Sequence, residues 1–528
     1  MLQFDDLQSP KIAVMSADGI HSSPTSPTHI RLERAPNQLA IFVASPAQPL
    51  SRVVLRWPHQ FPSSALYLGD HWERGYGDLQ WRHLQPQRVL PWYFLAHDSA
   101  SAETVGLGVK VQPNALCFWT VDDQGISLWL DLRNGTGSVD LGTRELHAAT
   151  VVSTRGRPGE SPFSVARRFC QIMCPNPRLP RAPVAGNNNW YYAYGEGFEA
   201  QTIQRDAAFL AELAGSHPNR PFCTIDAGWS PGSVCPGGPW TAGRPDTFPD
   251  MPALAARIKS LGVRPGIWIR PTALTTVDNP ARLRPGYTGG ETESPLDLSL
   301  PENLACIADD IARLRHWGYE LIKHDFSTYD AFGQWGFQMG ASPGRGQWRY
   351  RDTSLTNAEI ILRLYRTLRH AAADAYLLGC NTIGHLGAGL FEIQRTGDDT
   401  SGRVWERTRR MGVNTLAFRL PQHNTFFAAD ADCTPHTEKT PWDKNRQWLD
   451  LVARSGSPLF ISVDPTLATG EIRIAFKDAL QLALSGGEPG GIEPLDWLTN
   501  TCPNTWRLGS RTAHYSWTEP LGPSPLDC

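Results

Sequence analysis

The amino-acid sequence predicts an α/β fold: a (β/α)8 TIM barrel flanked by an N-terminal antiparallel β-sandwich and a short C-terminal β-rich region. Two observations support this prediction. Short β-rich runs punctuated by Gly, Pro, Asn and Asp fill the first part of the chain, as in sandwiches. Farther along, apolar runs of strand length alternate with amphipathic runs of helical length, which is the order of a barrel.

These changes of pattern divide the chain of 528 residues. We expect the sandwich in residues 1–165, a helix and a proline-rich linker in 166–184, the catalytic barrel in 185–485 and the C-terminal β region in 486–528.

The individual elements follow from local periodicity. Sandwich strands are expected at 38–43, 53–57, 116–121 and 126–132, and a short helix at 164–170. Barrel strands are expected at 188–194, 222–226, 263–269, 319–322, 375–378, 391–394, 414–418 and 458–462. Barrel helices are expected at 201–214, 251–261, 302–317, 357–373 and 474–484, and tail strands at 506–508 and 513–517.

The composition limits the classes of function. The net charge is −3 and no basic block occurs, so no nucleic-acid partner is expected. No apolar run reaches the roughly 18 residues of a membrane span. The 10 cysteines are scattered, and only Cys170 and Cys174 lie close together, without the spacing of a zinc site. We therefore expect free thiols and no zinc site.

The first residues carry acids where a signal peptide carries basic residues, and no apolar h-region follows. A cytoplasmic location is the expectation from this feature. The sequence leaves homo-oligomer formation open.

The most informative stretch is Lys323-His324-Asp325, at the end of an apolar run. A parallel barrel strand delivers its last side chains to the C-terminal rim, where barrel enzymes do their chemistry. A second stretch of this kind is Gln394 to Asp399, which ends in two aspartates. Each aspartate alone is equally explained as a helix N-cap.

Two carboxylates at two strand ends suit the cleavage of a glycosidic bond by a nucleophile and an acid. We predict Asp325 as the nucleophile, with Lys323 beside it favouring the ionised carboxylate. Asp398 and Asp399 compete for the role of proton donor. We expect the remaining polar and aromatic residues of the rim to contact substrate: Trp190, Asp226, Trp229, Trp268, Arg270, Lys323, Cys380, Asn381, Arg395 and Asp399.

Seven motifs in chain order resemble those of clan D of the glycoside hydrolases, families 27 and 36, which comprise α-galactosidases, α-N-acetylgalactosaminidases and raffinose synthases. The motifs are Asn188-Asn189-Trp190, Ile225-Asp226-Ala227-Gly228-Trp229, the segment 248–268, Lys323-His324-Asp325, Thr396-Gly397-Asp398-Asp399, Ala429-Asp430-Ala431-Asp432 and Ser457-Pro458-Leu459-Phe460-Ile461-Ser462. The resemblance implies a retaining double displacement without metal or cofactor, an oligosaccharide or glycoside as substrate, and Asp398 as acid/base.

Three positions depart from the family pattern. Ala227 stands where α-galactosidases carry a second aspartate that holds sugar hydroxyls, Arg270 stands near a position that is usually acidic, and Cys380-Asn381-Thr382 replaces the start of a glycine-rich motif. An arginine suits a carboxylate, sulfate or phosphate group on a sugar, and it equally suits a neighbouring Asp or Glu. The sequence therefore predicts a retaining α-glycoside hydrolase for a modified or non-galactose sugar. The alternatives are a raffinose-synthase-like transglycosidase and a non-catalytic carbohydrate-binding pseudoenzyme.

Overall fold

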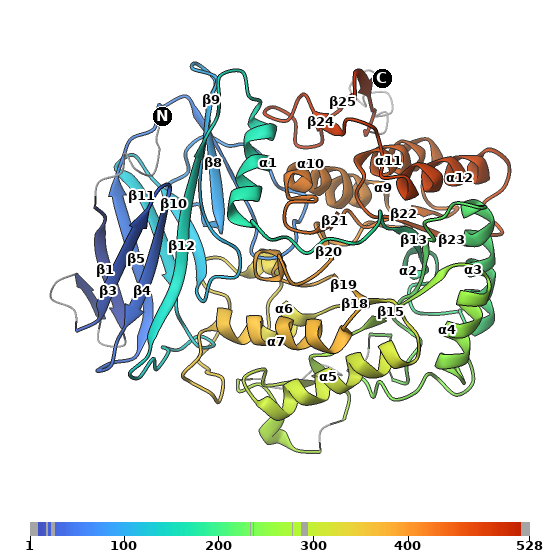
Figure 1. Cartoon of the computed structure of the whole chain (residues 1–528), viewed down its shortest axis with the longest axis horizontal. Coiled ribbons are helices and arrows are strands. Elements are labelled where there is room, and N and C mark those ends of the chain that lie inside the picture. The colour runs from blue at the N-terminus through green and yellow to red at the C-terminus, as the bar shows by residue number, and fades with distance from the viewer. Residues whose placement is uncertain are drawn as a thin grey trace, which may run out of the picture.

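The computed structural model describes residues 9–16, 19–22, 27–232, 234–235, 237–276, 278–286 and 294–518. The sandwich lies on one side of the molecule and the barrel on the other, with helix α1 (Pro162–Met173) between them (Figure 1).

Two antiparallel six-stranded sheets form the sandwich within the described residues, in the orders β2-β1-β5-β11-β10-β7 and β3-β4-β12-β9-β8-β6. The strands are β1 Lys11–Ser16, β2 Gly19–Ser22, β3 His29–Ala35, β4 Gln38–Ala44, β5 Leu50–Pro58, β6 Ala65–Gly69, β7 Leu90–Pro91, β8 Tyr93–Asp98, β9 Glu103–Val109, β10 Leu116–Val121, β11 Gly125–Asp131 and β12 Glu145–Arg155. Strand β4 shows why they form, because Leu39, Ile41 and Val43 alternate with less buried neighbours and face the core.

Helix α1 packs its apolar side on the sandwich. Ser161 caps its first turn by accepting a hydrogen bond from the backbone N–H of Ser164. Phe169 lies over Gly106 of β9, where an added Cβ would come within 2.7 Å of the ring. A glycine is required there because the helix approaches the sheet so closely.

Nine parallel strand segments form the barrel sheet, in the order β21-β20-β19-β18-β15-β14-β13-β23-β22. Their bounds are β13 Ala185–Asn188, β14 Phe222–Ile225, β15 Arg264–Ile269, β18 Leu321–His324, β19 Tyr376–Gly379, β20 Ile393–Arg395, β21 Ala428–Asp430, β22 Cys433–His436 and β23 Leu459–Val463. Segments β21 and β22 are separated only by Ala431 and Asp432, so they are one interrupted strand, the seventh, whose two halves pair with β20 and β23 and close the ring. The predicted fold class is confirmed.

The helices that cover the barrel are α3 Ala200–Ala214, α4 Met251–Ser260, α5 Pro301–His316, α7 Asn357–Ala372, α11 Trp442–Ser455 and α12 Gly470–Leu484. They surround the sheet in Figure 1, with α5 and α7 below it and α3 and α4 at its outer side. Strands such as β18 are buried on both faces, as parallel barrel strands are. A three-stranded sheet of β24 Ile492–Pro494, β25 Thr505–Leu508 and β26 Arg511–His514 follows α12.

Two predicted strands are wrong. The first barrel strand is Ala185–Asn188, and the rest of the expected run forms the short helix α2 (Trp190–Ala193), because the side chain of Asn188 accepts a hydrogen bond from the N–H of Trp190 and turns the chain. The expected strand at 414–418 is helical, in α10 (Thr415–Arg419). A short apolar run buried on all sides does not distinguish a strand from a buried helix.

Candidate active site

The carboxyl ends of neighbouring strands bring the predicted residues together. Trp268 of β15 is in register with Lys323 of β18, and Asp325 follows β18 directly, its N–H donating to the carbonyl of Ile269 at 3.0 Å. Arg395 ends β20, and Asp226 follows β14. These side chains therefore share one rim of the barrel.

Asp325 is held by two donors. The backbone N–H of Phe326 donates to Oδ1 at 2.7 Å, and the indole Nε1 of Trp268 donates to Oδ2 at 3.3 Å. Phe326 adopts φ 63°, a left-handed conformation that is uncommon for an aromatic residue. Strained backbone of this kind persists where the surrounding structure enforces it, and it often lies at functional sites.

Lys323 binds Asp226 rather than Asp325. Its ammonium lies 2.6 Å from Oδ2 of Asp226, which also accepts from the side-chain amide of Asn188 at 2.5 Å. Burial opposes the charge on Lys323, but the carboxylate of Asp226 raises the pKa of the lysine well above its ordinary value. Lys323 therefore carries a positive charge at the bottom of the site.

The two neighbouring aspartates after β20 have different surroundings. Both oxygens of Asp398 are ion-paired, Oδ1 with Arg74 at 2.9 Å and Oδ2 with Arg407 at 2.8 Å, and the side chain is 17% exposed. Asp399 is 37% exposed, and its Oδ1 pairs with Arg395 at 2.9 Å. Arg74 lies 3.7 Å from the same oxygen, and among the described residues no hydrogen bond reaches Oδ2. Although burial opposes it, the charges of Arg395, Arg74 and Lys323 lower the pKa of Asp399.

Arg395, which pairs with Asp399, is itself held by a buried carboxylate. Its guanidinium lies 2.6 Å from Oδ2 of the buried Asp432, and the hydroxyl of Tyr191 donates to the same carboxylate. Asp432 has φ 73° and lies at the interruption of the seventh barrel strand. Because the strand is interrupted at this point, the carboxylate of Asp432 meets Arg395, the arginine that pairs with Asp399.

Sequence reasoning missed a contribution from the sandwich. The loop after β6 carries Arg74 to Asp398 and Asp399, and it forms a parallel bridge between Gly75 and Gly397. The N–H of Gly75 donates to the carbonyl of Thr396 at 2.7 Å, and the N–H of Asp398 donates to the carbonyl of Gly75 at 2.8 Å. The run 70–78 signals this role weakly, because it is a loop dense in charged, aromatic and glycine residues.

Three of the predicted substrate contacts have partners within the protein. Arg270 is buried and forms a bidentate ion pair with Asp330, at 2.6 Å and 3.1 Å. Asn381 is buried and donates to both oxygens of Glu73, at 2.8 Å and 2.7 Å. Trp229 is fully buried and donates its indole N–H to the carbonyl of Trp268. These three side chains are therefore buried and fixed by other residues, and their contact with substrate stays a prediction.

The other two predicted contacts are Cys380 and Trp190. Cys380 is buried, and its pKa is raised by burial and by the charge of Asp325, so it is a neutral thiol. Trp190 is half-buried beside Tyr194. All nine described cysteines are free thiols, and Cys528 lies outside the described residues. Among the described residues, no cluster of three or more His, Cys, Asp or Glu side chains is arranged to hold a metal ion, and no helix is long and apolar enough to cross a membrane.

No protein-family model matches the sequence, and a search of curated proteins found no match. Solved structures do match the fold. The α-galactosidase TtGalA of Thermus thermophilus, in complex with p-nitrophenyl α-D-galactopyranoside, has a TM-score of 0.63 at 18% identity, over 96% of this chain and 99% of that one.

A variant of the family 36 α-galactosidase AgaA of Geobacillus stearothermophilus, in complex with 1-deoxygalactonojirimycin, has a TM-score of 0.63 at 13% identity, over 95% of this chain and 79% of that one. The galactosidase domain of the α-galactosidase-sucrose kinase AgaSK has a TM-score of 0.58 at 14% identity, over 90% of this chain and 74% of that one. The chain therefore has the fold of the clan D α-galactosidases, as its motifs predict.

Proposed function

We propose that this protein is a retaining α-glycoside hydrolase with Asp325 as its nucleophile. The observation that carries the proposal is the meeting of Asp325 with the Asp398–Asp399 pair at one barrel rim. The Cys235 thiol lies near this group: burial and then the charges of Asp325 and Asp226 raise its pKa to about 12, against the charge of Arg270. Three carboxylates around one space suit glycosidic cleavage better than a structural rim does.

In the first step, Asp325 attacks the anomeric carbon while a carboxylic acid protonates the departing oxygen. The donors from Phe326 and Trp268 hold the attacking carboxylate in one orientation. In the second step, the former acid acts as a base and activates the water that releases the sugar. Configuration at the anomeric carbon is retained because it is inverted twice.

The acid/base belongs to the Asp398–Asp399 pair. The motif resemblance favours Asp398. The contacts favour Asp399, because its arginine partners lie closest to one oxygen, Oδ1, and its side chain is the more exposed of the two, while both oxygens of Asp398 pair with guanidinium groups. An occupied carboxylate must lose an ion pair before it can take up a proton, so the two residues are separable by experiment.

The test is a set of variants assayed on aryl α-glycosides, including uronic acid and sulfated sugars. Asp325→Ala is expected to abolish turnover, because no other group is placed to form the covalent intermediate. The variant that lacks the acid/base is expected to lose activity on poor leaving groups, to retain the first step on activated aryl glycosides, and to be rescued by azide, which needs no base.

Asp398→Ala and Asp399→Ala form the matched pair of this test, with product stereochemistry read by NMR. The residue whose loss gives azide rescue with retained configuration is the acid/base. Full activity in all three variants would exclude the two-carboxylate mechanism and favour a binding protein.

Transfer to a sugar hydroxyl instead of water is the second candidate function. It uses the same two aspartates, and one of the structural neighbours was solved with stachyose. An acceptor sugar that diverts the glycosyl group from water into a new oligosaccharide would identify a transglycosidase.

A further inference from the structure

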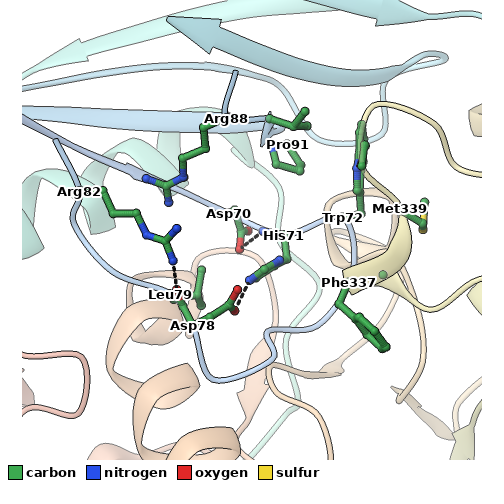
Figure 2. A pocket seen from close by; sticks show the side chains of 14 residues that line it. Asp70, His71, Trp72, Asp78, Leu79, Arg82, Arg88, Pro91, Phe337 and Met339 are labelled. Carbon is green, nitrogen blue, oxygen red and sulfur yellow. Dashed lines mark hydrogen bonds and ion pairs between the residues drawn. The ribbon is translucent and has the colours of Figure 1, made fainter. Parts of the chain in front are cut away.

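A cavity whose lining does not include Asp325, Asp398 or Asp399 lies between the loop after β6 and the segment 336–340. Its volume is about 240 Å³, and it is lined by Gly69, Asp70, His71, Trp72, Asp78, Leu79, Arg82, Arg88, Val89, Pro91, Gly336, Phe337, Met339 and Gly340. Figure 2 shows the cavity and its lining side chains. The size is slightly below the range of small-molecule sites, about 300–1,000 Å³, so it suits a compact ligand.

Two arginines of one loop face this cavity together. Figure 2 shows the guanidinium groups of Arg82 and Arg88 on the same side of it. Burial and the neighbouring charge of Arg82 lower the pKa of Arg88 to about 10. Two like charges held this close in a half-buried place cost free energy unless an anion joins them.

Neither arginine has a carboxylate within ion-pair distance among the residues that the structure describes. Arg88 donates to the carbonyl of Tyr67 at 3.1 Å, and Arg82 donates to the carbonyl of Asp78 at 3.3 Å and, with the amide of Gln80 turned to accept, to that side chain. A guanidinium has five N–H donors, so both keep donors for a ligand.

The two acids of the cavity wall are engaged elsewhere. Asp70 pairs with Arg419 at 2.7 Å and accepts from Gln422 at 2.8 Å. Asp78 pairs with His71 at 2.8 Å; although burial opposes it, the hydrogen bond and charge of His71 lower the pKa of Asp78 to about 2. Asp78 therefore stays ionised and its charge partly balances both arginines, but it forms an ion pair with neither.

We propose that this cavity binds a small oxyanion-bearing sugar derivative, with its carboxylate or phosphate group between Arg82 and Arg88. Arginine is the side chain suited to both groups, because its planar fork matches two oxygens at once. Phe337, which is 60% exposed, supplies apolar surface for a sugar ring at the rim of the cavity, and the buried Trp72, Leu79 and Pro91 form the wall behind it. The site is separate from the glycosidase chemistry, and its test does not depend on activity.

Binding is measured by titration calorimetry of the full chain with inorganic phosphate, glucuronate and neutral glucose, each up to about 20 mM at constant ionic strength set with sodium chloride. Phosphate or glucuronate is expected to bind more tightly than glucose by about tenfold or more. A preference for phosphate identifies a phosphorylated ligand, and a preference for glucuronate identifies a sugar acid.

Arg82→Gln and Arg88→Gln are each expected to weaken anion binding by about tenfold, and Arg88→Lys to weaken it less, because a lysine keeps the charge but not the fork. The matched control is Arg366→Gln, an exposed arginine of α7 far along the chain from the cavity. Circular dichroism and the melting temperature verify that each variant is folded. Equal binding of glucose and the two anions, equal binding by wild type and both glutamine variants, or no anion binding would each overturn the proposal.

Discussion

At the residue scale, the candidate site depends on how each carboxylate is held. Asp226 is tied to Lys323, and Asp325 to two N–H donors. Asp398 pairs with a different arginine at each oxygen, whereas the two arginines of Asp399 lie closest to one oxygen. The same residue type thus has four electrostatic settings within one rim. Different electrostatic environments allow side chains of the same type to take different roles in binding, nucleophilic attack and proton transfer.

Ala227 gives a prediction for substrate choice. It stands where the resembling α-galactosidases have an aspartate that accepts from sugar hydroxyls, and its backbone N–H donates to Asp226 Oδ1 at 2.8 Å. Without that acceptor, the site no longer favours sugars that carry this hydroxyl over sugars that lack it. We therefore expect slow turnover of aryl α-galactosides. Ala227→Asp is expected to raise kcat/KM on this substrate by about tenfold, with Ala227→Asn as its uncharged control. Rapid galactoside turnover by the wild type would contradict this prediction.

Asp206 gives a prediction for stability against pH. It is buried in α3 beside Tyr192, whose hydroxyl donates to it, and burial raises its pKa to about 7. The folded state keeps a proton that the unfolded chain loses near pH 4, so the free energy of unfolding falls as pH rises from about 4 to 7 and is level above that.

Asp206→Asn is therefore expected to flatten this slope and to stabilise the protein by about 2–4 kcal/mol at pH 8. Denaturant unfolding at several pH values measures it. The control is Asp309→Asn, at an exposed position of α5. An unchanged slope in Asp206→Asn would show that another group titrates.

At the element scale, the loop after β6 is the feature that joins the sandwich to the rim of the candidate active site. Gly75 and Gly397 lie face to face in a parallel bridge, and neither has room for a side chain. At Gly75 an added Cβ would lie 2.8 Å from Cγ2 of Thr415, and at Gly397 it would lie 2.2 Å from the carbonyl of Met411. The close approach of two backbones sets the position of Arg74 and of both acid/base candidates.

Gly75→Ala is expected to push the loop away from Thr415, to loosen the Arg74–Asp398 ion pair and to lower kcat about tenfold or more, while the melting temperature changes little. The control is Gly142→Ala, at a turn where nothing lies within 4 Å of an added Cβ, although its φ of 59° adds some strain. Equal activity of wild type and Gly75→Ala would mean that the bridge does not position the acid.

At the scale of the whole molecule, sandwich and barrel hold each other through α7. Thr356 caps this helix by accepting from the N–H of Glu359, and its hydroxyl also donates to the carbonyl of Asn114 in the sandwich at 2.5 Å. Glu359 closes the capping box and forms a bidentate ion pair with Arg144, both distances being 2.8 Å. A helix cap therefore serves as a contact between two layers of the protein.

Thr356→Ala is expected to reduce the free energy of unfolding by about 1–2 kcal/mol and to lower the melting of sandwich and barrel together. The matched control is Thr469→Ala, because Thr469 begins α12 without any side-chain capping bond. Calorimetry measures both variants. A loss confined to one of two separate transitions would contradict the coupling.

The sequence by itself determined the fold class and the main catalytic candidates. Periods of strand and helix specify which runs can bury their apolar faces, and strands such as 222–225 and 264–269 follow directly from them. A barrel sends strand ends to one rim, so Asp325 and the Asp398–Asp399 pair were predictable from local pattern alone.

The tertiary structure decided which partner each charge has. No local pattern indicates that Lys323 binds Asp226, that Arg270 is bound by Asp330, or that Arg74 reaches Asp398 from another layer of the molecule. The strand predicted at 414–418 is wrong for a related reason. A segment that is buried on all sides lacks the pattern of apolar and polar residues that distinguishes a strand from a helix. Ion pairs form between residues that the fold brings within about 4 Å regardless of their separation along the chain, and that information exists only once the chain has packed.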